Sequence, residues 1–264
     1  MRGHVGQGAA RFALQRLGFD VWALPTVLLS NHPGHGRSRG EVVEADRLSA
    51  LVEGLNDHGW LSRCDGVVSG YLGSPAQAVA IAAIVRRVKA VNPQALYLCD
   101  PVFGDENGAY AKLGVAEAIA RELLPLADIA APNRFELTSL TSKLVGGPMD
   151  AVNASRTLAI KEVLATSIDC GDGLIGSVMA TKDGAWKSST KRLENVPSGT
   201  GDLLSALYLA ARVRGEMPAT ALQSATSRVH AIIVESVGAD ELALVRCQSQ
   251  LANPAVVLTV DIVA

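Results

Sequence analysis

The chain has 264 residues, of which 48% are hydrophobic, so it can bury a sizeable core. Its formal net charge of −2 argues against a strongly basic nucleic-acid-binding protein. The four cysteines, Cys64, Cys99, Cys170 and Cys247, show no CxxC spacing. This excludes a disulfide scaffold and a CxxC-type zinc site, and it favours a reducing compartment. The longest uncharged run, 66–85, is interrupted by glycines and a proline, so no membrane span is expected.

Short apolar runs alternate with longer amphipathic runs along the chain, a pattern typical of strands alternating with helices. In chain order we expect a strand at 21–29, a helix at 47–59, a strand at 66–69, a helix at 74–91, a strand at 95–99, a helix at 115–124, a strand at 128–131, helices at 133–144 and 151–161, strands at 163–166 and 174–180, and helices at 202–214, 220–237 and 241–251. Residues 30–40 are rich in Gly, Pro and polar residues and predict a mobile loop. The alternation predicts a mostly parallel sheet covered by helices on both faces.

Two of these helices have the sequence of a capping box at their start. Ser74 precedes Pro75 and is followed by Gln77, and Asn133 is followed by Glu136. In a capping box the first side chain accepts from a backbone N–H three residues on, and the later side chain returns the bond. The two helices are therefore predicted to begin just after Ser74 and Asn133.

A glycine-rich turn directly precedes the apolar helix at 202–214. It consists of Gly199, Thr200, Gly201 and Asp202. Glycines let the backbone turn tightly and direct N–H groups outward, and the start of a helix favours an anion such as phosphate. Asp202 could then take a proton from a hydroxyl group that attacks phosphorus. The alternative is an ordinary glycine turn in which Asp202 only caps the helix, and this short pattern alone does not decide between them.

Acidic residues follow two other predicted strands. Asp100 and Asp105 come after the strand at 95–99, and Glu136 comes after the strand at 128–131. Because a doubly wound sheet binds ligands at the carboxyl ends of its strands, these side chains could gather there. Mg²⁺ keeps much of its hydration, so these three carboxylates could hold it largely through water. The alternatives are a simple turn at Asp100–Asp105 and a simple capping box at Glu136.

Five segments carry a resemblance to a known family: GHVGQGAARFALQRLGFDVWALPTVLLSNHPGHGR, SGYLGS, LCDPVFGD, ADIAAPNRFE and PSGTGDLLSAL. Their order and rough spacing are those of the ribokinase-like superfamily, and they span nearly the whole chain, from Gly3 to about Pro254. The chain resembles the pyridoxal kinases most closely, because the SNH loop and SGYLGS favour the vitamin B6 branch over the sugar kinases. The resemblance implies one three-layer α/β/α domain over residues 1–264, with a lid loop at about 30–40.

The resemblance implies ATP-dependent phosphorylation of the 5′-hydroxyl group of pyridoxal, and of pyridoxine and pyridoxamine, in vitamin B6 salvage. It implies Asp202 as the general base and the backbone of Gly199, Thr200 and Gly201 as an anion hole. The nucleotide-binding positions that it implies are Asp100, Ala131, Asn133, Glu136 and Thr166. The substrate-binding positions are Pro33, Gly34, Tyr71 and Asp202. Mg²⁺ would lie near Asp100, Asp105 and Glu136, and a need for K⁺ stays open.

The resemblance also implies a cytoplasmic homodimer that binds neither nucleic acid nor membranes. Pyridoxal kinases normally carry an apolar strand and a serine ahead of the GHVG segment. We therefore expect the 264-residue chain to be less stable and less active than a longer form from an upstream start. Two other readings stay open: a hydroxymethylpyrimidine or sugar kinase of the same superfamily, and a non-catalytic B6-binding pseudokinase. A substrate panel would distinguish the other kinases, and pyridoxal binding without ATP turnover would support the pseudokinase.

Overall fold

The computed structural model describes residues 2–263, so the two ends of the predicted domain, residues 1 and 264, lie outside it. Its main feature is a seven-stranded sheet of order β11-β10-β9-β8-β7-β4-β3. The strands are β3 (Gly66–Ser69), β4 (Leu96–Cys99), β7 (Ile129–Ala130), β8 (Glu162–Asp169), β9 (Leu174–Thr181), β10 (Ala185–Lys191) and β11 (Asp261–Ile262). Strands β3, β4, β7 and β8 pair in parallel, and the other three pairings are antiparallel. Since β10 again runs with β8, most strands share one direction, as predicted.

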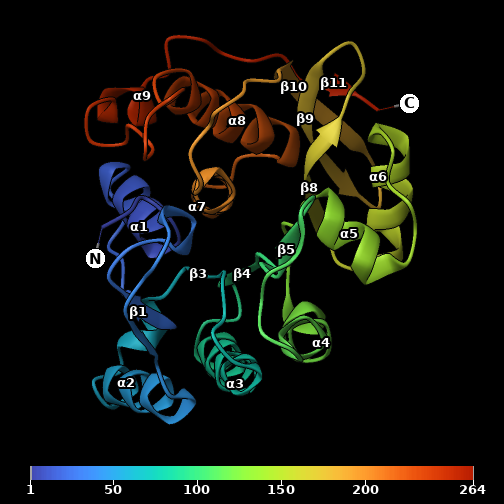
Figure 1. Ribbon diagram of the computed structural model, residues 1–264. Helices are drawn as coiled ribbons and strands as arrows, with labels where there is room; N and C mark the ends of the chain where they lie inside the picture. Colours follow the sequence, from blue (N-terminus) through green and yellow to red (C-terminus); the bar gives the residue numbers. More distant parts are fainter. Residues whose placement is uncertain (1, 264) are drawn as a thin grey trace.

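Helices cover both faces of this sheet (Figure 1). One face carries α1 (Gln7–Arg16), α7 (Thr200–Val213), α8 (Pro218–Val234) and α9 (Gln248–Ala252). The other carries α2 (Ala45–Asp57), α3 (Pro75–Val91), α4 (Val115–Ala118), α5 (Arg134–Thr141) and α6 (Pro148–Ser155), with α2 packed on α3. The three-layer α/β/α class is confirmed.

Shorter elements lie at the margins of the sheet. Two small antiparallel ribbons pair β1 (Val27–Leu29) with β2 (Gly40–Val42), and β5 (Gly104–Asp105) with β6 (Gly108–Ala109). Single turns of 3₁₀ helix occupy η1 (Pro33–His35), η2 (Trp60–Arg63), η4 (Leu124–Leu126) and η5 (Arg156–Leu158), and η3 (Ile119–Leu123) is a π-helical turn. The first ribbon encloses the predicted lid loop.

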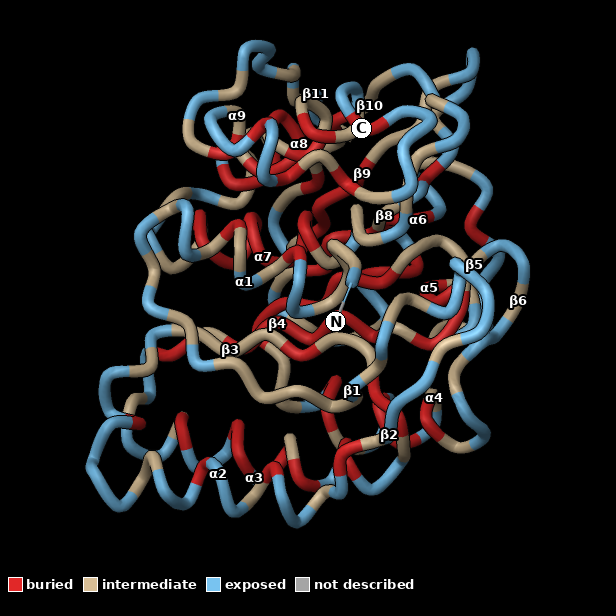
Figure 2. The backbone as a smooth tube through the Cα atoms, turned by 60° about the vertical axis from the view of Figure 1, so that its left-hand side comes forward, coloured by how far each residue is buried: buried red, intermediate tan, exposed pale blue. Residues whose placement is uncertain are grey.

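Neighbouring residues of the central strands point into opposite layers of the core. Leu98 packs in the cluster formed with α7 and α8, whereas Tyr97 and Cys99 pack in the cluster formed with α3 and α4. A strand that is buried on both faces has no polar positions, which explains the continuous apolar runs in the sequence. In Figure 2 the buried segments follow these strands and α7, and the connecting loops are exposed. Helix α7 is the most enclosed, since its residues from Leu203 to Ala211 are all buried.

Several predicted elements differ from the structure where a local pattern was weak or misleading. Helix α1 was missed because the only residues that it buries are two alanines, Ala9 and Ala13, which give a weak apolar periodicity. Strand β10 was missed because its sequence, AWKSSTK, is mostly polar, and β11 was also missed. The strand expected at 21–29 is paired only over β1, and the helix expected at 241–251 forms only over α9.

The predicted capping box at Ser74 is wrong, whereas the one at Asn133 is confirmed. Ser74 makes no side-chain cap bond. The Gln77 side chain instead accepts from the N–H of Gly73 and donates to the carbonyl oxygens of Thr26 and Val43. Gln77 is completely buried, so its amide must find partners within the protein. It thereby ties the start of α3 to the β1–β2 ribbon.

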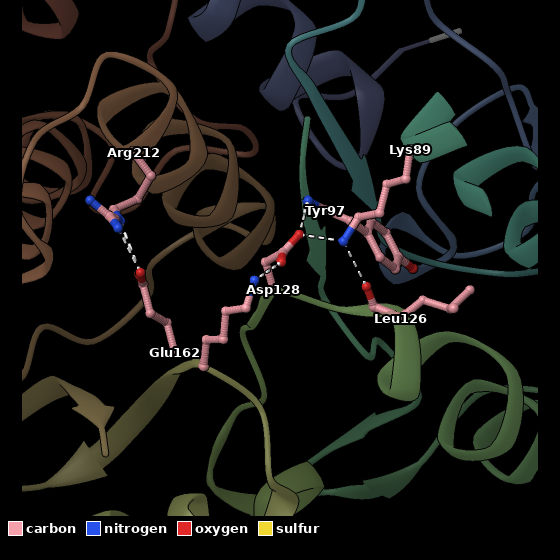
Figure 3. Close-up of polar contacts among 7 residues, drawn as sticks. Lys89, Tyr97, Leu126, Asp128, Glu162 and Arg212 are labelled. Carbon is pink, nitrogen blue, oxygen red and sulfur yellow. Dashed lines mark hydrogen bonds and ion pairs between the residues drawn. The ribbon is translucent and has the colours of Figure 1, made fainter. Parts of the chain in front are cut away.

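A buried carboxylate, Asp128, holds the sheet together at the end opposite to the predicted site (Figure 3). Its oxygens lie 2.5 Å from Nζ of Lys89 and 2.8 Å from Nζ of Lys161, and it accepts from the N–H of Tyr97 at 3.0 Å. Burial alone would raise the pKa of Asp128, but the hydrogen bonds from these three donors outweigh it and lower the pKa. The ionised carboxylate therefore stabilises the fold.

Replacing Asp128 by asparagine is expected to lower the free energy of unfolding by about 1.5–3 kcal/mol, the usual value of a hydrogen bond to a charged group. Because the pKa is lower in the folded state, the stabilisation is present above the ordinary value of 3.8 and is lost as the pH falls through the folded-state value. Urea unfolding at pH 7 and at pH 3 measures both effects. The matched control is Asp183→Asn, since the exposed Asp183 carboxylate bonds to no described residue. Equal stability of Asp128→Asn and Asp183→Asn at pH 7 would contradict this prediction.

Candidate active site

The start of α7 forms a turn that only glycine can occupy. Gly199 is the residue before the helix and has φ of 105°, and a Cβ atom there would lie 2.1 Å from the carbonyl oxygen of His4. The turn is thus pressed against the N-terminal segment of the chain. The N–H groups of Thr200 and Gly201 belong to the first turn of the helix, where no intrahelical acceptor exists. They are therefore available to an anion.

Asp202 is the third residue of α7, and its side chain does not cap the helix. Its Oδ2 atom accepts a hydrogen bond from the N–H of Gly6 at 2.8 Å. Burial raises the pKa of Asp202, and the Gly6 bond partly offsets the rise. The interpretation of Asp202 as an ordinary N-cap is therefore wrong, and the carboxylate has the raised proton affinity that suits a base.

Asp100 directly follows β4 and bonds to Ser205, which lies about one turn after Asp202 on α7. Its Oδ2 atom accepts from Oγ of Ser205 at 2.8 Å, and the residue is 7% exposed. Burial raises the pKa of Asp100 well above its ordinary value, and repulsion from Glu136 and Asp202 raises it further. The structure therefore brings the predicted acids of three separate segments into one electrostatic cluster.

Glu136 anchors this cluster through the confirmed capping box. Its Oε2 accepts from the N–H of Asn133 at 2.9 Å, and Oδ1 of Asn133 accepts from the N–H of Glu136 at 3.0 Å. Its Oε1 also accepts from the N–H groups of Phe103 and Gly104. Burial raises the pKa of Glu136 to about 7, although the hydrogen bonds from the three backbone N–H groups lower it. Glu136 is thus both a cap and a member of the acidic cluster, so the capping box does not exclude a role for Glu136 in metal binding.

Asp105 lies at the rim of the cluster in β5. Its Oδ1 accepts from the N–H of Asn107 at 2.8 Å, as expected for a turn, and its charge contributes to the raised pKa of Glu136. Tyr110, which no sequence pattern singled out, is 52% exposed and lies near enough to the same cluster to sense its charge. Burial raises its pKa, and further rises come from Glu136, Asp105, Asp100 and Asp202.

The acidic cluster fits a hydrated divalent cation better than a directly bound one. Within residues 2–263, no three His, Cys, Asp or Glu side chains come together closely enough to hold a metal ion. The Oδ1 atom of Asp100 nevertheless makes no hydrogen bond to another described residue. Repulsion among the neighbouring carboxylates adds to the rise that burial causes in the pKa values of Asp100 and Glu136. Mg²⁺ holds several waters and needs few protein oxygens, which matches this donor set.

Three of the predicted nucleotide-binding residues, Ala131, Asn133 and Thr166, lie just after β7 and within β8. Asn133 bridges to Thr166 in parallel register, and its Nδ2 donates to the carbonyl oxygen of Gly104 at 2.8 Å. Ala131 is buried beside them. A pocket of about 200 Å³ opens next to Asn133 and is lined by Asp105, Glu106, Asn107, Asn133, Arg134, Phe135, Ser167, Ile175 and Arg192. Ala131 and Thr166 do not line it.

Two residues of this pocket escaped the sequence analysis. Ser167 follows Thr166 and has φ of 58°, at an irregularity in the pairing of β8 with β9. The side chain of Arg192, just after β10, makes no hydrogen bond or ion pair with another described residue. Because β10 itself was not predicted, no local signal placed Arg192 at this edge.

The predicted lid residues form a second pocket with the N-terminal segment. His32 accepts from the N–H of Gly34 through Nδ1 at 3.2 Å and caps η1, which begins at Pro33. This pocket, also of about 200 Å³, is lined by Gly3, His4, Val5, His32, Gly34, His35, Val196, Pro197, Ser198, Asp240 and Glu241. It adjoins the Gly199 turn. Gly34 lines it, whereas Pro33, Tyr71 and Asp202 do not.

Comparison with known proteins decides the family. A family model described as phosphomethylpyrimidine kinase matches residues 62–244. The chain is 39% identical to pyridoxal kinase PdxY of Rubrobacter xylanophilus over 264 residues, covering 96% of this chain and 91% of that protein. It is also 39% identical to pyridoxal kinase PdxY of Pseudomonas fluorescens, with the same coverage. The chain belongs to the pyridoxal kinase family.

Solved structures of pyridoxal kinases share the fold over the full chain. The pyridoxal kinase of Leishmania donovani in complex with ADP and pyridoxamine has a TM-score of 0.93 and 28% identity, covering 100% of this chain and 96% of that one. The pyridoxal kinase of Entamoeba histolytica with PLP has a TM-score of 0.91 and 26% identity, covering 100% and 95%. This agrees with the resemblance carried by the GTGD, SNH and SGYLGS segments. Among residues 2–263, no helix is long and apolar enough to cross a membrane.

Proposed function

We propose that this member of the pyridoxal kinase family transfers the γ-phosphoryl group of ATP to the 5′-hydroxyl group of pyridoxal, and to that of pyridoxine and pyridoxamine. ATP-dependent phosphorylation of B6 vitamers is supported by the curated relatives and by related structures with ADP and pyridoxamine or pyridoxine. The observation that carries the proposal is Asp202 in the first turn of α7, beside free N–H groups and the carboxylates of Asp100 and Glu136.

In the proposed reaction Asp202 takes the proton of the 5′-hydroxyl group as its oxygen attacks the γ-phosphorus. The new O–P bond forms while the bond between the γ-phosphorus and the bridging oxygen of ADP breaks, and ADP leaves with that electron pair. Charge on the transferring group is then met by the N–H groups of Gly199, Thr200 and Gly201, which need no rearrangement at the moment of reaction.

Asp100, Asp105 and Glu136 would hold Mg²⁺, largely through water. When bound, such an ion neutralises phosphate charge. Asn133, Ala131 and Thr166 would contact the nucleotide, and the pocket beside Asn133 adds Ser167 and the unpaired Arg192. A guanidinium group is well suited to phosphate oxygens because its donors form a planar fork.

On the vitamer side, Pro33 and Gly34 would close over the ring, and Tyr71 would form part of its wall. Residues 30–40 would act as the lid of a single kinase domain, excluding water that competes for the phosphoryl group. The four cysteines of the chain are free, which suits a reducing cytoplasm. We also propose that the enzyme works as a homodimer, as the family resemblance implies.

A second candidate substrate is a hydroxymethylpyrimidine, because the matching family model is described as phosphomethylpyrimidine kinase. Both substrates carry a primary hydroxymethyl group on a flat heteroaromatic ring. The acceptor chemistry is therefore the same, and only the ring pocket distinguishes them.

The deciding experiment is to incubate the purified 264-residue chain with Mg·ATP and either pyridoxal or hydroxymethylpyrimidine, following pyridoxal phosphate by absorbance and ADP by a coupled assay. Steady formation of pyridoxal phosphate, faster than turnover of the pyrimidine, is expected. Faster turnover of the pyrimidine would transfer the assignment to that substrate. Binding of pyridoxal without ADP formation would instead identify a non-catalytic B6-binding protein.

A further inference from the structure

The two oxygens of the Asp202 carboxylate have different surroundings. Oδ2 accepts the hydrogen bond from the N–H of Gly6, so one of its lone pairs is already used. Oδ1 makes no hydrogen bond to another described residue, and Asp202 keeps a small part of its surface exposed. A proton can therefore be taken up most readily at Oδ1.

Gly70 faces this free oxygen. A Cβ atom built on Gly70 would lie 3.7 Å from Oδ1 of Asp202 and 4.0 Å from Cγ2 of Val102, with no other atom as close. A methyl group would thus fit without a clash, and Gly70 is not among the glycines with positive φ. Backbone conformation does not require glycine at this position, and neither does packing within the chain.

The backbone around Gly70 is held firmly. The preceding Ser69 ends β3, and its hydroxyl group lies 2.7 Å from the hydroxyl group of the buried Tyr97. The carbonyl oxygen of Ser69 accepts from the N–H of Asp100, and that of the following Tyr71 accepts from Oγ1 of Thr26 at 2.7 Å. The open space next to Oδ1 is therefore a fixed feature of the site.

We propose that Gly70 is a positioning residue whose missing side chain leaves the space in which the acceptor hydroxymethyl group approaches Oδ1 of Asp202. This inference rests on the proposed function, since it names the place of the phosphoryl acceptor in that reaction. A hydroxyl group that gives its proton to Oδ1 must come within about 2.6–3.2 Å of it. A methyl group 3.7 Å from the same oxygen would occupy part of the space that the hydroxyl group needs to reach Oδ1.

The test is Gly70→Ala, assayed with pyridoxal and Mg·ATP beside the wild type. We expect kcat/KM for pyridoxal to fall about 100-fold, because a displacement of about 1 Å of a reacting group costs that much. The Tm and the Kd for ADP should stay unchanged, since the methyl group meets no atom closer than 3.7 Å. Slow ATP hydrolysis without vitamer should also persist, because water is smaller than a hydroxymethyl group.

A matched control variant makes the result specific. The matched control is Gly54→Ala in α2, where a Cβ atom would meet nothing within 4 Å and φ is again not positive. It should keep wild-type kinetics.

Each other outcome is decisive. A value of kcat/KM for Gly70→Ala within about threefold of the wild type would overturn the inference and leave the proposed function intact. A lower Tm or a weaker Kd for ADP would also overturn it, because the space next to Asp202 would then not be open. A wild-type chain that phosphorylates no hydroxymethyl substrate would overturn the proposed function itself and the inference with it.

Discussion

Asp202→Asn is expected to lower kcat for pyridoxal phosphate formation by about 10³-fold, within the range usual for loss of a general base. Asparagine has nearly the same shape and can still accept the hydrogen bond from Gly6, so the Tm should change little. Its amide cannot take up a proton at neutral pH. The measurement is steady-state turnover together with a thermal melt.

The pH profile gives a second readout for Asp202. Burial raises the pKa of this carboxylate, so wild-type kcat/KM should fall as the pH drops through that raised value and the base becomes protonated. The Asp202→Asn variant should lack this acidic limb. Asp183→Asn is the control and should keep both the rate and the profile. A turnover of Asp202→Asn within tenfold of the wild type would remove Asp202 from the role of base.

Gly199→Ala is expected to damage both stability and catalysis. A Cβ atom there would lie 2.1 Å from the carbonyl oxygen of His4, and φ of 105° is strained for alanine. The turn must move, which takes its N–H groups away from the transferring phosphoryl group. We expect a loss of about 10²–10³-fold in kcat, as for removal of an oxyanion-hole donor, and a lower Tm.

The control for backbone strain is Gly201→Ala, which adds a methyl group to the same turn without a clash. A Cβ atom on Gly201 would meet nothing within 4 Å, so Gly201→Ala should keep the wild-type Tm. Equal melting temperatures for Gly199→Ala and Gly201→Ala would show that the contact with His4 is not needed for the fold. Wild-type kcat in Gly199→Ala would show that the turn does not act as the anion hole.

Features that depend on neighbouring residues could be predicted from the sequence. The capping box of Asn133 and Glu136 joins positions only three apart, and its atoms meet as soon as the helix starts. The strand predicted at 66–69 is β3, because its two adjacent valines are β-branched and favour extended backbone. Ser74 and Gln77 have the same spacing as the confirmed box, yet Gln77 bonds to Thr26 and Val43, which lie elsewhere in the chain.

Elements with few buried apolar side chains were the hardest to predict. Strand β10 pairs with β9 at seven positions, but its sequence is mostly polar and contains few apolar residues. Helix α1 likewise packs on α7 through small side chains, which leave little trace in a hydropathy pattern.

The sequence was sufficient to identify the class of fold, the glycine turn before an apolar helix, and the acids that follow the central strands. These depend on periodicity and on spacing over a few residues. It could not show that Gly6 would bond to Asp202, 196 positions away, or that Ser205 would bond to Asp100, 105 positions away. Only the packing of α1 and α7 against the sheet brings these groups together. The free oxygen of Asp202 and the open space at Gly70 arise from that packing, because each depends on atoms from segments that no local pattern connects.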